Sequence, residues 1–439
     1  MRDWLHSAQE RSKLRPAELL ALAGATPETP IFHLEKPVEG LALLALGAAW
    51  EIRTSGAERF GEASRAAIEA LARLPRSTDP RFGPLVLGGF GFSDADCLEP
   101  EWREFPSARL WIPELLWVRR GGECRLTRIW RDGAERDIER RLCRATQAAS
   151  DAAADGVRSA TRFRPDPDER RRWGERVEAA CARIAAGGLD KVVLARRRVM
   201  HLDPAAEPVA ILRAARRRRP SCFNFWIGGR ETSFVGSSPE RLVALDGDRF
   251  IAGALAGSAP RGRRRGEDER LGEALLACPK NRREHELVVT AVRESLAPVS
   301  TSLRVGEHAT LLRLPEAQHL TTPITGRLAE RLTVLDLAGL LHPTPAVCGV
   351  PRDAARRLIE QQEPGRGWFS GAVGWMAENG AGEVAVALRS VLIDGAAATV
   401  WAGAGIVSGS SAEAEFSETE AKMSALFETL GATADEHAA

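Results

Sequence analysis

Two Asp-Gly pairs, which begin at Asp246 and Asp394, each stand between two runs of apolar residues. The flanking runs are 240–245 and 249–255 for the first pair, and 383–393 and 398–407 for the second. Asp-Gly between two strand-like runs is one of the strongest local signals for a β-hairpin with a short turn. A hairpin joins antiparallel neighbours, so the sequence predicts antiparallel sheets and argues against a doubly wound parallel sheet.

The other apolar patterns predict further strands with helices between them. Strand-like runs occur at 30–35, 42–52, 85–92, 110–118, 124–130, 223–227 and 232–236, and from 191 onwards. Helical spacing occurs at 60–74, 169–186, 267–277, 281–297 and 333–341. Together these elements predict an α/β (α+β) sandwich, in which large, mostly antiparallel sheets are flanked by helices.

A stretch of small and polar residues with two prolines, 147–168, has the composition of a linker. It divides the chain of 439 residues into an N-terminal structural half of the fold, 1–150, and a region in which we expect the chemistry, 165–432. The first region contains no residues with the spacing of a nucleophile, a metal site or a phosphate loop.

The charge and cysteine content argue against several classes of function. The net charge of +1 implies no general attraction to nucleic acid or membranes, and the short arginine runs are interpreted as solvated faces. The seven cysteines never have CxxC spacing, which argues against zinc and disulfides and for a reducing compartment. The N-terminus lacks an apolar signal segment, and no apolar run reaches the length of a membrane span. We therefore expect a cytoplasmic protein that binds neither nucleic acid nor a membrane.

The segment 402–430 is predicted to contain the end of a strand, a turn of small residues and a helix. Glu415, Glu418 and Lys422 fall together at the edge of the apolar face of that helix, at spacings of three and four residues. Two carboxylates and an ammonium group at such an edge suit the wall of a cleft. The alternative is an exposed Glu–Lys pair on an ordinary amphipathic helix.

Glu284 falls on the buried side of its predicted helix, because it precedes Val288 by four residues. A buried carboxylate is costly unless it is paired with a cation or a metal. Glu284 and Glu418, from two helices, could hold one Mg²⁺, which takes few protein ligands and leaves places for water and a substrate oxygen. A buried ion pair with Arg389 or Arg282 is the alternative.

Two further residues could transfer protons. Lys191 opens a predicted strand, where a lysine is usually at the surface, and it could act as a base only if burial lowers its pKa. Glu240 follows Pro239 and is either an acid or a plain residue at the start of a strand.

Taken together, these stretches resemble the chorismate-utilising enzymes, and among them the isochorismate synthases. Ten matching segments occur in the order typical of the family, between about residues 190 and 430. They are KVVLARR (191–197), GSSPERLV (236–243), ALAGSAPRG (254–262), KNRREHELV (280–288), QHLTTPITG (318–326), HPTPAVCGVPR (342–352), GWFSGAVGW (367–375), ALRS (387–390), AGAGIV (402–407) and EFSETEAK (415–422). The resemblance implies one α/β sandwich of mostly antiparallel sheets with the active site between them, which agrees with the hairpin pattern.

The resemblance also implies a role for each charged residue. Lys191 would be the general base that activates water for attack at C2 of chorismate, and Glu240 the general acid that protonates the leaving C4 hydroxyl. Glu284 and Glu418 would bind Mg²⁺, which would hold the ring carboxylate. The other implied substrate contacts are Gly257, Ser258 and Lys422 at the ring carboxylate, Arg389, Gly403 and Gly405 at the enolpyruvyl carboxylate, and His319.

The resemblance favours one branch of the family. Anthranilate synthases use ammonia and lack a lysine at the position of Lys191, so this residue favours water as the nucleophile. No glutaminase region is visible, and HLTTPI and HPTPAVCGVPR resemble isochorismate synthases more than salicylate synthases. The N-terminal half resembles menaquinone-branch enzymes more than siderophore enzymes. We therefore expect a monomeric isochorismate synthase without a glutaminase subunit, which feeds menaquinone or siderophore biosynthesis.

Two residues depart from the family pattern. Asn281 stands where an acid is common near the metal, and Phe369 stands where tyrosine is common in the pocket. The first bears on Mg²⁺ affinity and the second on pyruvate elimination as a side reaction. The alternative activities are a salicylate synthase, which continues to pyruvate elimination, and an inactive homologue that serves as a binding subunit. The joint presence of Lys191, Glu240 and Arg389 with the two acids argues against the inactive homologue.

Overall fold

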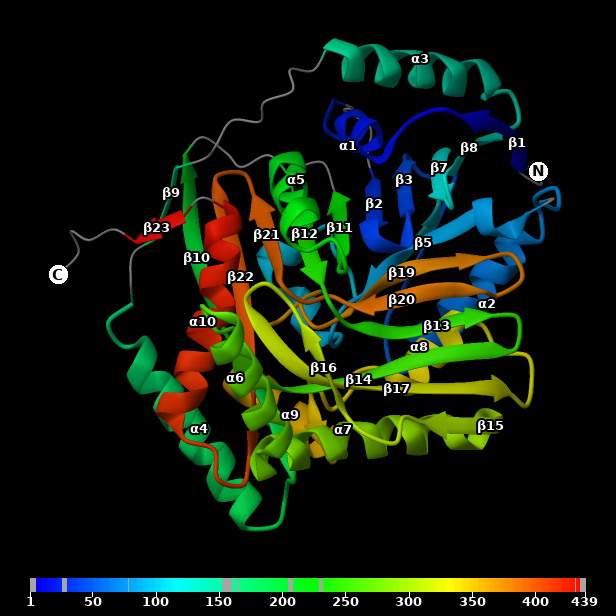
Figure 1. Ribbon diagram of the computed structural model, residues 1–439. Helices are drawn as coiled ribbons and strands as arrows, with labels where there is room; N and C mark the ends of the chain where they lie inside the picture. Colours follow the sequence, from blue (N-terminus) through cyan, green and yellow to red (C-terminus); the bar gives the residue numbers. More distant parts are fainter. Residues whose placement is uncertain are drawn as a thin grey trace.

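The computed structural model describes residues 5–25, 30–77, 79–151, 160–163, 166–203, 208–228, 232–430 and 432–434. Within these residues the chain forms two large sheets that pack against each other, with helices on their outer sides (Figure 1). Among their strand pairs only β9–β23 is parallel. This arrangement confirms the expected sandwich of mostly antiparallel sheets.

The larger sheet has 13 strands, and the short strand β18 (Gly349–Val350) joins it beside β10. In spatial order the other strands are β1 (Leu5–Ser12), β8 (Glu123–Arg131), β7 (Leu115–Arg120), β3 (Leu41–Leu46), β2 (Ile31–Lys36), β11 (Phe223–Gly228), β12 (Thr232–Ser238), β21 (Ser390–Asp394), β22 (Ala397–Val407), β10 (Lys191–Asp203), β9 (Ala160–Phe163) and β23 (Ala432–Ala434).

The smaller sheet has 10 strands, of which β16 (Thr310–Arg313) pairs only with β17. In spatial order the others are β15 (Ser300–Val305), β17 (Ala317–Leu328), β14 (Arg249–Pro260), β13 (Arg241–Asp246), β20 (Gly382–Val386), β19 (Ala372–Ala377), β5 (Leu85–Phe90), β6 (Ala108–Ile112) and β4 (Trp50–Thr54).

The two regions predicted from the sequence, 1–150 and 165–432, build both sheets jointly. They meet at the β2–β11 pair in the larger sheet and at the β5–β19 pair in the smaller one. That the first region is structural and the second carries the chemistry stays a prediction. The predicted linker lies partly outside the described residues, and helix α3 continues to Asp151 within it.

The helices cover the outer faces of the two sheets (Figure 1). They are α1 (Pro16–Ala25), α2 (Arg59–Leu71), α3 (Glu135–Asp151), α4 (Glu169–Ala185), α5 (Pro208–Arg218), α6 (Arg265–Ala277), α7 (Pro279–Leu296), α8 (Val334–Leu341), α9 (Arg352–Gln362) and α10 (Ala412–Leu430). Helices α1, α3, α5 and α10 share an apolar core with the larger sheet, and α2, α7 and α8 share one with the smaller sheet. A third core, rich in tryptophan and phenylalanine, fills the space between the sheets.

The two hairpins predicted from Asp-Gly are confirmed. Asp246 pairs with Arg249 across the first turn, and Asp394 pairs with Ala397 across the second. Each two-residue loop therefore begins at the glycine, which has φ of +61° at Gly247. A glycine in the first loop position suits the twist of a hairpin, since a side chain there would be strained.

Three runs predicted as single strands are each divided between the two sheets. Residues 42–52 form β3 and β4, 110–118 form β6 and β7, and 383–393 form β20 and β21. Except for β4, whose residues are only partly buried or exposed, the strands beside these breaks are mostly buried, so the apolar pattern continues while the chain passes from one sheet to the other. Hydrophobic periodicity alone cannot mark such a passage.

No helix in the described part of the chain is long and apolar enough to cross a membrane.

Candidate active site

Two passages of the chain between the sheets lie beside each other and build the centre of the site. Glu240 lies between β12 and β13, and Arg389 lies between β20 and β21. The passages are joined by backbone hydrogen bonds, from Ser237 N to Arg389 O at 3.1 Å and from Val386 N to Glu240 O at 3.0 Å. Arg389 has φ of +51°, which is strained for a residue with a side chain. The run 383–393, which the sequence predicts as one strand, is therefore interrupted at Arg389, because β20 ends at Val386 and β21 begins at Ser390.

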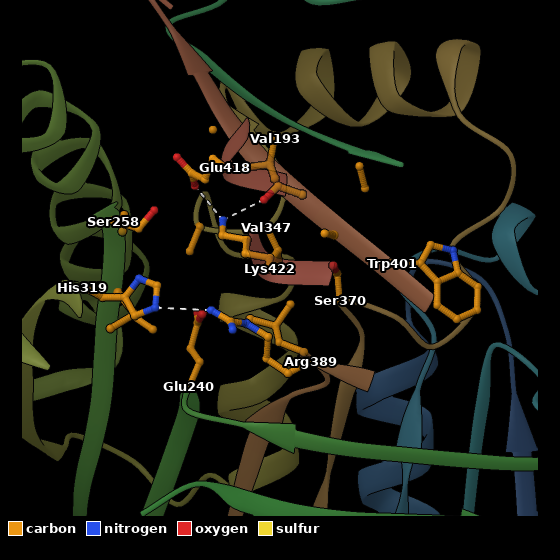
Figure 2. Close-up of a pocket in the computed structure, with 18 of the residues that line it drawn as sticks. Val193, Glu240, Ser258, His319, Val347, Ser370, Arg389, Trp401, Glu418 and Lys422 are labelled. Carbon is orange, nitrogen blue, oxygen red and sulfur yellow. Dashed lines mark hydrogen bonds and ion pairs between the residues drawn. The ribbon is translucent and has the colours of Figure 1, made fainter. Parts of the chain in front are cut away.

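A cavity of about 100 Å³, the volume open to the centre of a water molecule, lies between these passages, α10 and the start of α7. Ten of the eleven site residues predicted from the sequence line it. They are Glu240, Gly257, Ser258, Glu284, His319, Arg389, Gly403, Gly405, Glu418 and Lys422. Figure 2 shows Ser258, Glu418 and Lys422 at one end of the cavity, and Glu240, His319 and Arg389 at the other.

Lys191 is the predicted site residue that does not line the cavity. It is the first residue of β10, it is fully buried, and its Nζ lies 3.0 Å from Glu284 Oε1. The contact lacks the geometry of a hydrogen bond, and Nζ has no hydrogen-bond partner among the described residues. Lys191 thus lies beside the cavity wall, next to Glu284 and Gly405.

Glu284 enters the cavity wall from α7, where it is buried as its helical position predicts. Gly405 in β22 makes room for it, since a Cβ atom at Gly405 would lie 2.1 Å from Glu284 Oε1 and 3.2 Å from Lys191 Cε. The proposed alternative partners of Glu284, Arg282 and Arg389, are not its partners: the cation in contact is Lys191.

Helix α10 supplies Glu418 and Lys422. Ser411 caps the helix, with its Oγ accepting from Ala414 N at 3.3 Å. Lys422 Nζ donates to Glu418 Oε1 at 2.7 Å and to Gly403 O at 2.8 Å, so the pair is turned towards β22 while both side chains stay partly exposed. Burial opposes ionisation of Glu418, but Lys422 and the Ser258 hydroxyl outweigh it and lower the pKa of the carboxyl.

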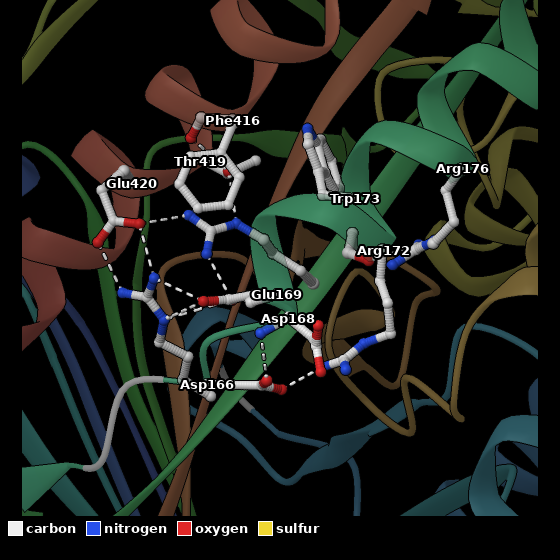
Figure 3. Close-up of polar contacts among 12 residues, drawn as sticks. Asp166, Asp168, Glu169, Arg172, Trp173, Arg176, Phe416, Thr419 and Glu420 are labelled. Atoms are coloured by element: carbon white, nitrogen blue, oxygen red, sulfur yellow. Dashed lines mark hydrogen bonds and ion pairs between the residues drawn. The ribbon is translucent and has the colours of Figure 1, made fainter. Parts of the chain in front are cut away.

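An ion-pair network fixes α10 and α4 on β10 (Figure 3). Arg196 contacts Glu169 of α4 at 2.5 Å and Glu420 of α10 at 2.6 Å. Arg198 contacts the same two carboxylates, each within 2.7 Å. Because Glu420 is two residues from Glu418, this network sets the position of the helix that carries Glu418 and Lys422.

The other end of the cavity is desolvated. Burial raises the pKa of Glu240 to about 8, against the opposing effect of Lys191. Burial also lowers the pKa of His319 to about 3, with a further contribution from Arg389. At neutral pH the Glu240 carboxyl is therefore mostly protonated and His319 is neutral. Arg389 Nη2 lies 3.5 Å from His319 Nε2 and remains the cation at this end.

Sequence reasoning missed three charged residues next to the site. Glu316 contacts both Arg219 and Arg389, and Lys280 Nζ lies 2.5 Å from Glu415 Oε1. Lys280 directly follows the proline that opens α7, so its place one turn before Glu284 was a usable signal. Glu316 and Arg219 lie in turns, and no periodic pattern indicates which way their side chains point.

The donor set fits a hard divalent cation. Glu284 and Glu418 line one cavity from two helices, and the absence of a side chain at Gly405 lets the Glu284 carboxylate reach the cavity wall. No group of three or more His, Cys, Asp and Glu side chains among the described residues is arranged to hold a metal. A cation bound here would take two protein carboxylates and complete its shell with water and substrate oxygens, as is common for Mg²⁺.

Residues 2–431, nearly the whole chain, match the family described as chorismate binding enzyme. The chain belongs to this family. The salicylate biosynthesis isochorismate synthase of Pseudomonas aeruginosa is 35% identical over 96% of this chain and 89% of its own length. The isochorismate synthase MenF of Bacillus subtilis is 32% identical over 80% of this chain and 75% of its own length.

This chorismate binding enzyme also shares its fold with a solved relative. The menaquinone-specific isochorismate synthase MenF from Escherichia coli superposes with a TM-score of 0.80 at 28% sequence identity, over 97% of this chain and 94% of that one. The family and the fold that the ten sequence segments implied are thus confirmed.

Proposed function

We propose that this protein is an isochorismate synthase, which isomerises chorismate by adding water at C2 and removing the C4 hydroxyl. One observation carries the proposal: a single cavity holds a protonated acid, Glu240, beside a buried arginine, Arg389, while two carboxylates, Glu284 and Glu418, line the same cavity. A substrate with two carboxylates and a poor leaving group needs this set of partners. Named isochorismate synthases among the relatives support it.

The proposed binding mode follows the charges. The enolpyruvyl carboxylate would lie at Arg389, beside neutral His319, and the backbone near Gly403 and Gly405 would contribute further contacts. The ring carboxylate would lie at the opposite end, near Lys422 and the Gly257–Ser258 backbone. Strand β22 of the larger sheet, strands β14 and β17 of the smaller sheet and helix α10 carry these contacts, so the ring would be enclosed between the layers of the sandwich.

Glu240 is the proposed general acid, and its protonated state at neutral pH is what the loss of a C4 hydroxyl requires. Lys191 is the proposed general base for the attacking water. Only the amine form of a lysine can accept a proton from water, and the contact of Lys191 with Glu284 would have to loosen for its Nζ to reach that water.

Mg²⁺ is the proposed cofactor, and Glu284 and Glu418 are its proposed ligands. The bound cation would withdraw charge from the conjugated ring carboxylate and so favour substitution on the ring. In the proposed site the lysines that now contact these acids, Lys191 and Lys422, would remain nearby to bind substrate and to transfer protons.

The cellular setting is also proposed. A cytoplasmic monomer without a glutaminase subunit would supply isochorismate to menaquinone or siderophore biosynthesis. A relative named for menaquinone supports the first destination, and a relative named for salicylate biosynthesis supports a route through salicylate. Salicylate synthesis is the second candidate activity, and Phe369, which stacks on Trp401 in the cavity wall with ring centroids 5.8 Å apart, is the residue that bears on it.

Product analysis tests the function. The protein is incubated with chorismate and Mg²⁺, with and without ammonium, and the products are separated by chromatography. We expect isochorismate under both conditions, with pyruvate and salicylate at trace levels. Anthranilate with ammonium, or salicylate with equimolar pyruvate, would assign the protein to another branch.

A further inference from the structure

Glu316 joins two buried arginines beside the proposed substrate site. Its Oε1 atom lies 2.8 Å from Arg219 Nε and 2.9 Å from Arg389 Nη1. The side chains of Arg219 and Arg389 are 4% and 9% exposed, and that of Glu316 is 14% exposed. Two buried guanidinium groups therefore share one carboxylate.

The two guanidinium groups and the one carboxylate of this cluster sum to one positive charge. His319 is neutral and burial raises the pKa of the Cys222 thiol, so these two neighbours do not offset it, and the carboxylate of Glu418 acts on Arg389 from a greater distance. A buried excess charge is costly unless an anion from outside balances it. One carboxylate of a bound substrate would do so.

Glu316 contacts Arg389 from outside the proposed reaction cavity. A second cavity of about 460 Å³ lies beside the first and shares Ser258, Arg389, Glu418 and Lys422 with it. Glu316 lines only this second cavity, whereas His319 lines only the first. The guanidinium of Arg389 thus lies between them, with Nη1 held by Glu316 and Nη2 near His319.

We propose that Glu316 is a positioning residue, which holds Nη1 of Arg389 so that the remaining edge of the guanidinium faces a substrate carboxylate. Arg219 anchors Glu316 from the other side. The inference rests on the proposed function, because it takes the carboxylate of chorismate as the partner of Arg389.

Two features indicate that Glu316 positions the Arg389 guanidinium and does not compete with the substrate carboxylate for it. Glu316 immediately precedes β17, in a turn closed by a hydrogen bond from Leu314 N to Ala317 O at 2.8 Å, so its backbone is fixed. Arg389 lies in a short passage outside any strand, and Glu316 is the carboxylate that its side chain contacts, at 2.9 Å from Nη1. A competitor would occupy the reaction cavity, which Glu316 does not line.

The two roles predict opposite effects of Glu316→Gln on KM. Glu316→Gln leaves the two positive charges of Arg219 and Arg389 without the carboxylate that they share. If Glu316 competes with the substrate carboxylate for Arg389, this variant should have a lower KM for chorismate. A positioning Glu316 gives a KM about tenfold higher with kcat changed less than about twofold, because a charge-assisted contact that orients Arg389 is lost. An unchanged or lower KM would overturn the proposal.

Further variants separate positioning from folding. Glu316→Asp should restore part of the loss, and Arg219→Gln should raise KM by itself, since it releases Glu316. In an Arg389→Ala background, Glu316→Gln should cause no further increase, and an equal further increase would contradict the proposal. Melting temperatures identify variants that are merely unfolded.

Glu51 provides a matched control. Its carboxylate is also shared by two arginines, Arg53 at 2.7 Å and Arg109 at 3.0 Å, and none of the three lines the reaction cavity. Glu51→Gln should leave the KM unchanged. Isochorismate formation by the wild type tests the function separately. If none forms, the Glu316 inference is judged by chorismate binding in calorimetry, where the Kd should still rise about tenfold in Glu316→Gln.

Discussion

The acid assignment predicts a specific dependence of rate on pH. Glu240 is 5% exposed, and burial raises the pKa of its carboxyl to about 8. An acid must be protonated to act, so activity should be lost as pH rises through about 8. A carboxyl with that pKa is about nine-tenths protonated at pH 7 and about one-tenth at pH 9, so kcat/KM should fall about tenfold across this interval.

In the Glu240→Gln variant the fall of kcat/KM between pH 7 and pH 9 should disappear. The amide has nearly the size of the carboxyl but donates no acidic proton, so kcat should fall by about 10² to 10⁴. The measurement is the initial rate of isochorismate formation by chromatography from pH 6 to pH 9.5. A wild-type rate that stays flat to pH 9, or a variant that keeps the tenfold fall, would refute the assignment.

The same pKa predicts a change in stability. The carboxyl titrates near 4.5 when unfolded and near 8 when folded, so its contribution to stability is present below about pH 4.5 and lost as pH rises to about 8. The difference between these two pKa values corresponds to at most about 5 kcal/mol in the free energy of unfolding. Glu240→Gln should therefore gain melting temperature relative to the wild type between pH 5 and pH 8, whereas a constant difference would contradict a buried acid.

The remaining predictions concern the metal site and the substrate contacts. Gly405→Ala places a methyl group against the Glu284 carboxylate and should weaken Mg²⁺ binding about tenfold or more in calorimetry; unchanged affinity would contradict the ligand assignment. EDTA should abolish turnover, excess Mg²⁺ should restore it, and Glu418→Gln should raise the Mg²⁺ concentration for half-maximal rate; full turnover in EDTA would exclude the metal. Lys191→Ala should lower kcat by about 10² to 10⁴, and a near-normal rate would remove it as the base. Arg389→Ala should raise KM about a hundredfold with less effect on kcat; an unchanged KM would make it a structural residue.

Much of this architecture could be read from local signals. Asp-Gly between apolar runs specified both hairpins, and the spacing of Glu284 to Val288 placed the acid on the buried side of α7. The apolar face of α10 placed Glu418 and Lys422 on one flank. Each of these features depends on residues within one or two turns of each other, which a sequence pattern can report.

The remaining features depend on contacts between distant segments. The apolar run that contains Arg389 continues through the break between β20 and β21, so the pattern hides the passage and its positive φ. The pairing of Glu316 with Arg219 joins residues 97 positions apart, and both lie in turns. Lys191 was expected to act on the water that attacks the substrate, but its side chain is buried against Glu284, which α7 carries from a distant part of the chain.

Isotope labelling tests the central claim most directly. The protein is incubated briefly with chorismate and Mg²⁺ in H₂¹⁸O, and isochorismate is collected before equilibrium is reached. Addition of water at C2 with loss of the C4 hydroxyl predicts isochorismate that carries one ¹⁸O at C2. Unlabelled isochorismate would mean that the hydroxyl moves within the molecule, and the absence of isochorismate would contradict the proposed function itself.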